Sequence, residues 1–266
     1  PVEISSEILK FLNKRALEFL KRDIDGVVIT VPAYFDEAQR QATKDSATLA
    51  GMKVLRLLNE PTAAAIAYGL DLQEEGTVAV YDLGGGTFDI SILRLVKGVF
   101  EVLATGGDAS LGGDDFDLLV SDWIRHELGF NYALDPHELR ELAEVACEAK
   151  EALTYSDSTH ISLFGCSGQI TRETMGELFK PLIEKTLRSC KRTLCDAGIK
   201  TGQVNDIVLV GGSTKMPIVQ AQVSDFFCQQ AHSEIDPDHV VALGAALQAD
   251  ILVGNQGSDA LLLLDV

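Results

Sequence analysis

Apolar residues recur along the chain with two periods, which alternate from one segment to the next. Residues 5–22 carry an apolar side chain every three or four positions, including Ile8, Leu12 and Phe19, and this spacing predicts an amphipathic helix. Gly26 then opens VVITV, a β-branched run that is typical of a buried strand. Helical and strand patterns continue to alternate along the chain, which favours a mixed α/β fold.

Capping and turn residues place the boundaries of the other expected elements. Asp36 is a good N-cap for a helix that runs to about Ala50, and Pro61 suits the first turn of an Ala-rich helix. The apolar tail LLLLDV follows the last expected helix and suggests a linker, or a strand that belongs to something downstream. The remaining expected elements are strands at 54–59, within 77–95, at 98–107 and from 206, a hairpin formed by HISLFG and GQITR, and helices at about 113–128, 136–155, 175–197, 216–228 and 238–252.

Acidic residues dominate the charge of the chain. Its 266 residues carry 40 Asp and Glu against 22 Lys and Arg, a formal net charge of −18. Nucleic acids and anionic membrane surfaces attract cationic proteins, so this balance argues against both as partners. An acidic protein can still bind ATP where Gly-rich backbone and Mg²⁺ supply a local positive potential.

The five cysteines and five histidines show no spacing that is typical of a metal site or a disulfide framework. We therefore expect free thiols in a reducing compartment, no zinc site and no Ser-His-Asp or Cys-His catalytic arrangement. No signal peptide is visible, and no uncharged apolar run approaches the roughly 18 residues of a membrane span. These features predict a cytoplasmic protein.

The segment DLGGGTFD carries the strongest chemical signal. Its three consecutive glycines, 84–86, lie between two expected strands, where they let the backbone approach a ligand and form an anion-binding nest. Thr87 adds a hydroxyl, and the carboxylates of Asp82 and Asp89 flank the turn, as suits a hydrated Mg²⁺ beside phosphates. The alternative is an ordinary β-hairpin with a Gly turn and solvated acids. The motif favours phosphate binding.

Three weaker signals accompany this motif. Gly211, Gly212 and Ser213 follow the strand IVLV and precede an expected helix, which suits a nucleotide or an ordinary strand-to-helix connection. They match neither a P-loop nor a dinucleotide fingerprint. Asn59 and Glu60 suit the start of a helix, although Glu60 could instead orient water or a hydrated metal. The acids of LGGDDFD likewise suit a first helical turn, although its glycines could admit a phosphate.

Taken together, these segments resemble the nucleotide-binding domain of the DnaK-type chaperones, a branch of the actin-like ATPase superfamily. The resemblance implies an α/β fold of the actin-like ATPase (ribonuclease H-like) type, with ATP or ADP and Mg²⁺ as ligands. FDISILRLVKGVFEVLATGGD and QADILVGN look closest to the HscA branch, which is specialised for iron–sulfur cluster assembly. The strings that carry the resemblance run in the family's order: VVITVPAYFDEAQRQAT, LLNEPTAAAIAYG, VYDLGGGTFDISIL, GGDASLGGDDFD, DIVLVGGSTKMP and DPDHVVALGAALQADIL.

The resemblance implies roles for individual residues. The second phosphate loop would consist of Asp82, Gly84, Gly85, Gly86 and Thr87, with Asp82 and Asp89 near the hydrated Mg²⁺. Glu60 would lie beside the γ-phosphate, and Gly113 would meet the phosphates from the second lobe. The nucleoside would be held by Lys150, Thr154, Gly211, Gly212, Ser213, Lys215 and Asp238, while Pro32 and Arg40 would relay the nucleotide state to a substrate domain.

The sequence departs from the family pattern at two positions of the expected nucleoside pocket. Lys215 stands where many relatives use an arginine to stack on adenine, and a lysine lacks the guanidinium plane that stacking needs. Cys147 stands where relatives often place a glutamate for the ribose.

The resemblance also implies a division of the chain, with an incomplete first lobe and a complete second lobe. The first lobe would be a remnant at 1–71, because a first phosphate loop resembling D-L-G-T-T-N-S and the catalytic lysine that follows it are not among these residues. Phosphoryl transfer needs groups on both sides of the phosphates, so we expect these 266 residues alone to bind nucleotide weakly and to hydrolyse little ATP. The other expected parts are a base subdomain of the second lobe at 72–111 and 181–252, its upper subdomain at 112–180, and the start of an interdomain linker at 253–266.

Three functions remain open at this point. The first is a fragment of the ATPase that drives a peptide-binding chaperone, either in iron–sulfur cluster assembly or in general protein folding. Its implied partners are a J-domain co-chaperone, an iron–sulfur scaffold protein or other client peptide, and a nucleotide-exchange factor. The second is a non-catalytic module that binds nucleotide or the exchange factor. A sugar kinase of the same superfamily is the third, although no sugar-binding pattern is visible.

Overall fold

The computed structural model describes residues 1–73, 75–130, 132–254 and 264–265. The chain forms two compact units. The first contains 1–80, 91–105 and 234–266, and the second contains 81–90 and 106–233. Each unit is described by itself. The lobe boundaries expected from the sequence stay a prediction.

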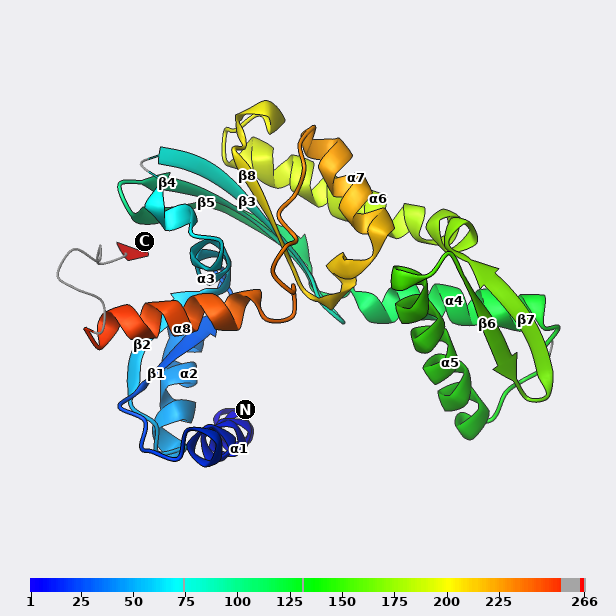
Figure 1. The fold of residues 1–266 in the computed structure, drawn as a ribbon, viewed down its shortest axis with the longest axis horizontal. Helices are drawn as coiled ribbons and strands as arrows, with labels where there is room; N and C mark the ends of the chain where they lie inside the picture. The colour runs from blue at the N-terminus through cyan, green and yellow to red at the C-terminus, as the bar shows by residue number, and fades with distance from the viewer. Residues whose placement is uncertain (74, 131, 255–263, 266) are drawn as a thin grey trace. The chain divides into compact units, whose positions relative to one another are not determined.

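A pair of parallel strands and the helices around it form part of the first unit (Figure 1). The strands pair from Val27↔Val54 to Val31↔Asn59. Helix α1 packs on α2, and α3 packs on α8, which also contacts β1. The elements are α1 (Val2–Leu20), β1 (Val27–Val31), α2 (Glu37–Leu49), β2 (Val54–Asn59), α3 (Glu60–Ala67) and α8 (Val240–Leu252), with a 3₁₀ turn at Leu70–Leu72.

The backbone of α8 passes close to the backbone of α3, with Gly244 facing Ala63. A Cβ added to Gly244 of α8 would lie only 1.8 Å from the carbonyl oxygen of Ala63 in α3. Residues 61–66 of α3 are buried. The run TAAAIA therefore supplies small side chains on the surface where a second helix backbone passes closely.

Helix α1 has the predicted spacing but a largely exposed apolar face. Ser6 is its buried residue, whereas Phe19 is 86% exposed and Ile8 and Leu12 are more than half exposed. The periodicity identified the helix correctly, because it depends on local spacing. It did not determine which part of the apolar stripe is covered, because that depends on the neighbouring elements.

Three long strands, β3, β4 and β5, run through both units and form the centre of a five-stranded sheet with the order β8-β3-β4-β5-β9. The predicted three-strand block is confirmed. Residues 264–265 of the tail pair in parallel with β5, at Val99↔Leu264 and Phe100↔Asp265, and 255–263 and 266 of the predicted linker lie outside the described residues. The strands are β3 (Glu75–Leu83), β4 (Phe88–Val96), β5 (Val99–Asp108), β8 (Asp206–Val210) and β9 (Leu264–Asp265).

The second unit contains one end of each of these strands, together with further helices and a short strand pair. Tyr81 is fully buried and its hydroxyl lies 2.7 Å from the hydroxyl of Thr186, while Phe116 and Phe179 meet edge to face. The predicted hairpin is confirmed as the antiparallel pair β6 and β7. Its elements are α4 (Gly113–Glu127), α5 (Pro136–Tyr155), β6 (Ser158–Leu163), β7 (Cys166–Thr171), α6 (Arg172–Asp196) and α7 (Pro217–Phe227), with 3₁₀ turns at Thr201–Gln203 and Gly212–Lys215.

Local chemistry explains why several boundaries fall where the sequence places them. The Asp36 side chain accepts a hydrogen bond from the Gln39 amide, and Gln39 bonds back to the Asp36 amide, which makes a capping box. Gly51 and Gly69 adopt positive φ after helices, a conformation that glycine tolerates best. No helix in the described part of the chain is both long and apolar enough to cross a membrane.

Candidate functional site

The loop between β3 and β4 forms a tight turn with an open backbone face. The amide of Gly84 donates to the carbonyl of Thr87 at 3.0 Å, which closes the turn. Gly85, Gly86 and Thr87 are exposed, and a Cβ added to Gly85 or Gly86 would meet no atom within 4 Å. Within the described residues of the second unit, the space beside the glycines is therefore open, as an approaching phosphate would require.

Two other segments of the second unit hold this loop in place. The amide of Gly113 donates to the Gly84 carbonyl at 2.9 Å, and the amide of Asp114 donates to the Gly85 carbonyl at 2.8 Å. The hydroxyl of Ser213 donates to the Gly84 carbonyl at 3.0 Å. These bonds turn the loop carbonyls toward the protein, so the loop is tied down while its glycine face stays open.

Gly112 and Gly211 allow these segments to approach so closely. A Cβ on Gly112 would lie 2.5 Å from the carbonyl oxygen of Gly85 and 2.5 Å from the amide nitrogen of Gly86. Gly211 has a φ of +85°, and a Cβ there would lie 2.4 Å from the carbonyl oxygen of Leu83. Both contacts are with backbone, which cannot move aside without displacing the loop.

One of the acidic residues in the first turn of α4 caps the helix. The carboxylate of Asp115 accepts a hydrogen bond from the Gly112 amide at 2.8 Å, so this acid caps the helix, as the local interpretation of LGGDDFD predicts. The amide of Gly113 is already bonded to Gly84. A contact between Gly113 and phosphate, which the resemblance implies, stays a prediction.

Asp82 and Asp89 lie at the two ends of the turn and have unusual protonation behaviour. Burial, followed by the nearby charge of Asp89, raises the pKa of Asp82 to about 6, and burial also raises the pKa of Asp89. Two half-buried carboxylates that repel each other are stabilised by a cation, and carboxylate oxygens are ligands that Mg²⁺ accepts, often through water. The donor set therefore fits a hydrated Mg²⁺. Among the described residues, no three His, Cys, Asp or Glu side chains form a metal-binding group by themselves.

Lys150 of α5 reaches the same corner of the second unit. Its ammonium lies 2.8 Å from the Asp117 carboxylate and 3.3 Å from the Gly113 carbonyl, and both partners of the ion pair are mostly buried. Burial raises the pKa of Asp117, and Lys150 partly opposes the shift. The thiol of Cys147, one turn earlier on α5, has a pKa raised by burial and by the Asp117 charge. Thr154 lies one turn beyond Lys150 on the same helix.

The structure thus brings together several of the predicted site residues of the second unit, but shows no contact that adds Thr154 or Lys215 to them. Strand ends, the start of α4 and the Gly211 turn meet around residues 84–87, and Lys150 joins them through Gly113. The sequence did not single out Gly112 as a packing position or Asp117 as the partner of Lys150. No local pattern signals either contact, because each joins segments that are distant in sequence.

The other predicted site residues belong to the first unit. The guanidinium of Arg40 donates to the side-chain oxygen of Asn59 at 2.7 Å and to the carbonyls of Phe35 and Ala33. Asn59 occupies the N-cap position of α3 and Glu60 its first turn, as the helix-start interpretation predicts, although the Asn59 side chain makes no capping hydrogen bond. Glu60, Pro32 and Asp238 also lie in this unit, and their roles stay predictions. The five described cysteines are free thiols.

A turn with an open glycine face, flanking carboxylates and a supporting helix start suits the binding of nucleotide phosphates. The family model described as "Hsp70 protein" matches residues 1–266, and the chain therefore belongs to the Hsp70 family, whose ATPase domain has the actin-like fold.

Curated relatives agree with this assignment. The chain is 59% identical over all its 266 residues to "Chaperone protein HscA" of Escherichia coli O139:H28 and to "Chaperone protein HscA homolog" of Aliivibrio fischeri MJ11. It is 58% identical over the same length to "Chaperone protein HscA" of Klebsiella pneumoniae. In each comparison the chain spans 43% of the relative's length.

Proposed function

We propose that this chain supplies one side of the ATP site of an HscA-type chaperone, with residues 84–87 as a phosphate-binding loop. The observation that carries the proposal is a tethered turn with an open glycine face. The carbonyls of Gly84 and Gly85 accept hydrogen bonds from Gly113, Asp114 and Ser213, and no atom of the described residues lies within 4 Å of a Cβ placed on Gly85 or Gly86. Backbone that is held in place in advance loses little entropy when a phosphate binds.

Mg²⁺ would be held through water by Asp82 and Asp89 and would supply positive charge that neutralises the phosphates. The turn formed by Gly211, Gly212 and Ser213 supports the loop, because the Ser213 hydroxyl donates to the Gly84 carbonyl. Together with Lys215, this turn would border the adenosine. Lys150 and Thr154 would line the nucleoside pocket from α5. The roles of Glu60, Asp238, Pro32 and Arg40 in the first unit, and of Thr87 in the loop, belong to the same proposal.

The chaperone role and its partners are further parts of the proposal. Sequence identity to proteins named HscA supports a role in iron–sulfur cluster assembly over general protein folding. The partners would be a J-domain co-chaperone, an iron–sulfur scaffold or other client peptide, and a nucleotide-exchange factor. The cytoplasmic location stays a prediction.

The first experiment asks whether the 266 residues are one side of a two-sided site. We expect hydrolysis of Mg·ATP by this chain near the background rate. A chimera that carries the first phosphate loop and lysine of an HscA relative before Pro1 should hydrolyse it measurably, because phosphoryl transfer needs positioning from both sides. Calorimetric titration and a phosphate-release assay measure both proteins. Equal hydrolysis by the two proteins would contradict the one-sided site, and an inactive but folded chimera would contradict the ATPase assignment.

The second experiment uses the raised pKa of Asp82. In the folded state Asp82 holds its proton up to about pH 6, whereas an unfolded aspartate loses it near its model value of 3.8. The protonated Asp82 side chain therefore contributes to the free energy of unfolding at low pH, and this contribution is lost as the pH rises from about 4 to 6. Asp82→Asn should remove this slope and raise the free energy of unfolding at pH 7.5 by about 1–3 kcal/mol. Urea denaturation at pH 4.5 and 7.5 measures it.

Asp89→Asn is the matched comparison for this experiment. It removes the charge that contributes to the Asp82 shift, so the pH slope should shrink without vanishing. In the chimera both variants should weaken Mg·ADP binding, because each removes a carboxylate near the metal. A pH slope that persists in Asp82→Asn would show that another group causes it.

A further inference from the structure

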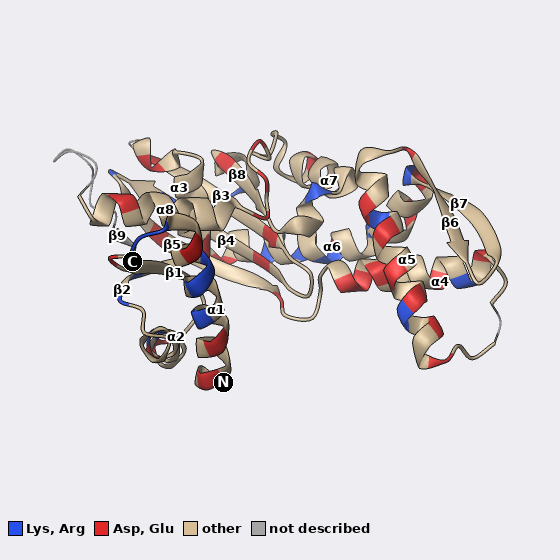
Figure 2. Ribbon diagram, turned by 60° about the horizontal axis from the view of Figure 1, so that its bottom comes forward, with Lys and Arg blue, Asp and Glu red and all other residues tan. Residues whose placement is uncertain are grey.

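The exposed face of α6 carries a row of cations, although the chain as a whole is strongly acidic (Figure 2). Residues 180–192 contain five of the 22 Lys and Arg of the chain, and Glu184 is the single acid among them. All five cations are exposed, and their spacing places them within one half of the helix circumference. This basic row of α6 consists of Lys180, Lys185, Arg188, Lys191 and Arg192.

The opposite side of α6 is fixed inside the second unit. Ile183, Thr186, Cys190 and Leu194 are buried on that side. The hydroxyl of Thr186 lies 2.7 Å from the hydroxyl of Tyr81, which belongs to β3. Because these buried contacts fix the rotation of the helix about its axis, the basic row is held on the side that faces away from the sheet.

The side chains of the basic row have no partner of their own. Within the described part of the chain, none of the five forms an ion pair or a side-chain hydrogen bond. Helix α1 differs in this respect, because it places Glu7 2.6 Å from Lys10 and Glu18 3.9 Å from Lys14. The cations of α6 are therefore available to a ligand.

Like charges within the basic row repel one another. Lys185 and Lys191 lie three residues from Arg188, and Arg192 lies four residues from it. Like charges at these separations destabilise a helix. Glu184 lies four residues from Arg188 but forms no ion pair with it. An acidic ligand would relieve this repulsion, which adds to the attraction between the opposite charges.

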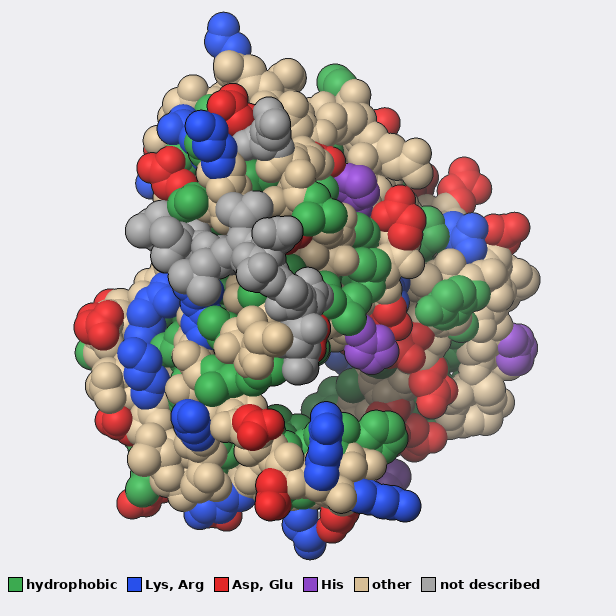
Figure 3. All heavy atoms as spheres, turned by 60° about the vertical axis from the view of Figure 1, so that its left-hand side comes forward, with side chains coloured by type: hydrophobic (Ala, Val, Ile, Leu, Met, Phe, Trp, Pro, Cys, Tyr) green, Lys and Arg blue, Asp and Glu red, His purple; other side chains and the backbone are tan. Residues whose placement is uncertain are grey.

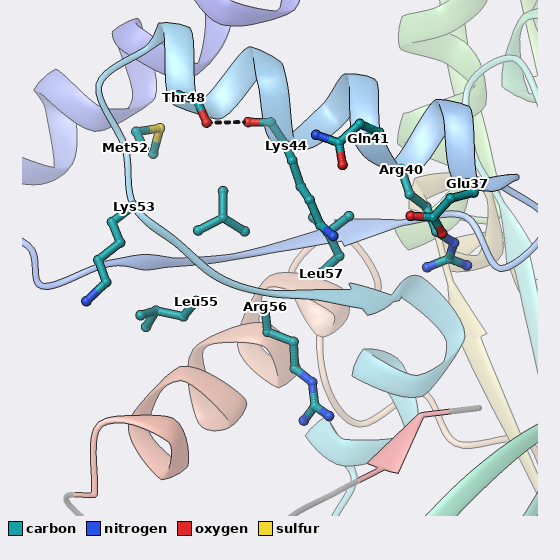
Figure 4. Close-up of a pocket in the computed structure, with 11 residues that line it drawn as sticks. Glu37, Arg40, Gln41, Lys44, Thr48, Met52, Lys53, Leu55, Arg56 and Leu57 are labelled. Carbon is teal, nitrogen blue, oxygen red and sulfur yellow. Dashed lines mark hydrogen bonds between the residues drawn. The ribbon is translucent and has the colours of Figure 1, made fainter.

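The cations of the first unit are arranged differently. A groove of about 840 Å³ lies there between α2 and β2 (Figure 4). Arg40, in its wall, donates hydrogen bonds to backbone carbonyls and to the Asn59 side chain. Lys44 extends from α2 toward β2, whereas Lys53 and Arg56 extend away from α2. These cations come from separate elements and point in different directions, so they form no row along one helix.

The length of the basic row limits the shape of its ligand. Lys180 and Arg192 are about 18 Å apart along the helix axis at 1.5 Å per residue. Glu177 and Asp196 are exposed one turn beyond the two ends. A nucleic acid or a bilayer extends well past this length, so its negative charges would meet these acids and the acidic remainder of the chain. A short helix with acids on one side fits between them, since two helices that cross at about 20° stay in contact over several turns.

We propose that the basic row of α6 binds an acidic helix of a protein partner, which lies alongside α6. Acids at positions i, i+4 and i+7 of the partner helix would meet Lys185, Arg188 and Arg192. The row contains none of the residues that we assign to the nucleotide, so this site is separate from the proposed phosphate-binding loop.

The probe is a capped, rhodamine-labelled, alanine-based peptide of eighteen residues with five glutamates on one helical face. Fluorescence anisotropy with the 266-residue chain should show saturable binding that weakens as salt rises. The double variant Lys185→Glu/Arg192→Glu should weaken binding by about tenfold or more, because two attractions become repulsions. The matched control is Lys21→Glu/Arg22→Glu after α1, which makes the same change in net charge and should leave binding unchanged. Circular dichroism confirms that both variants fold.

A milder variant separates binding from folding. Arg188→Gln removes the cation that has the other members of the row on both sides, so peptide binding should weaken several-fold. The same change relieves repulsion within α6, so the urea midpoint should not fall. A loss of binding that appears only together with a lower urea midpoint would overturn the proposal.

A second peptide tests whether the ligand is a helix with acids on one side. It has the same composition, with its five glutamates spread around the helix, and it should bind about tenfold more weakly. Equal binding of the two peptides would overturn the proposal, because net charge alone would then explain it. The proposal would also fail if the row bound phosphatidylglycerol vesicles or duplex DNA but not the peptide, or if the α6 and Lys21/Arg22 double variants lost binding equally.

Discussion

Gly112→Ala is expected to lower the affinity for Mg·ADP by about a hundredfold, or about 2.7 kcal/mol, and to destabilise the second unit by about 2 kcal/mol. The added Cβ would lie 2.5 Å from the Gly85 carbonyl oxygen and from the Gly86 amide nitrogen, both on the backbone of the proposed phosphate-binding loop. To relieve this contact the loop must move away from α4, which breaks the bonds from Gly113 and Asp114 to its carbonyls. Backbone strain is not the cause, because φ at Gly112 is −165°, an extended conformation that any residue adopts.

Gly85→Ala separates the structural effect from the effect on the ligand. A Cβ at Gly85 meets no protein atom within 4 Å, so the free energy of unfolding should change by less than about 0.5 kcal/mol. If phosphate occupies that space, affinity for Mg·ADP should still fall by about tenfold. Calorimetry on the chimera and urea denaturation of the 266-residue chain measure the two quantities. Unchanged affinity in Gly85→Ala would mean that the glycine face is not the phosphate site.

Gly244→Ala is expected to have the largest effect on the stability of the first unit. The new Cβ would lie 1.8 Å from the Ala63 carbonyl oxygen and 2.5 Å from its carbonyl carbon, so α3 and α8 would have to separate. Overpacking of this kind costs about 1–3 kcal/mol or more, and it exceeds the gain of about 1 kcal/mol that alanine brings to a helix. We expect a net loss of about 2 kcal/mol in urea denaturation.

Gly176→Ala is the matched control in another helix. Its Cβ would make an ordinary contact with Ile218 at 3.8 Å. The helix-propensity gain should then remain and stabilise the protein by about 0.5–1 kcal/mol. Opposite signs for the same substitution in two helices would demonstrate that helix contact, rather than propensity, decides the outcome at Gly244. A stabilising Gly244→Ala would contradict the close approach of α3 and α8.

Several large apolar side chains of α1 are exposed, which matters for handling the 266-residue chain. Figure 3 shows green apolar side chains at the surface among charged ones, and exposed apolar residues of α1 include Phe19 and Ile4. Contiguous exposed apolar surface favours association. The denaturation experiments are therefore best compared at more than one protein concentration.

Sequence by itself determined the elements and the type of site. The period of apolar residues depends on local geometry, so helices such as 136–155 and the strand 54–59 fall within a residue or so of their predicted limits. Helix caps such as Asp36 depend on neighbours three residues away, so the sequence predicts them as well. DLGGGTFD predicted an open glycine turn between two strands, because three adjacent glycines have a direct conformational consequence, and phosphate binding there is the function that we propose for it.

Only the tertiary structure decided which groups meet. Lys150 pairs with Asp117, Ser213 donates to the Gly84 carbonyl, and the side chain of Asn59, at the N-cap position of α3, accepts a hydrogen bond from Arg40. Each of these contacts joins residues whose separation in sequence carries no periodic signal. The raised pKa of Asp82 arises in the same way, since burial is a property of the packed units. The sequence thus determined what kinds of groups are available, and packing determined which of them act on one another.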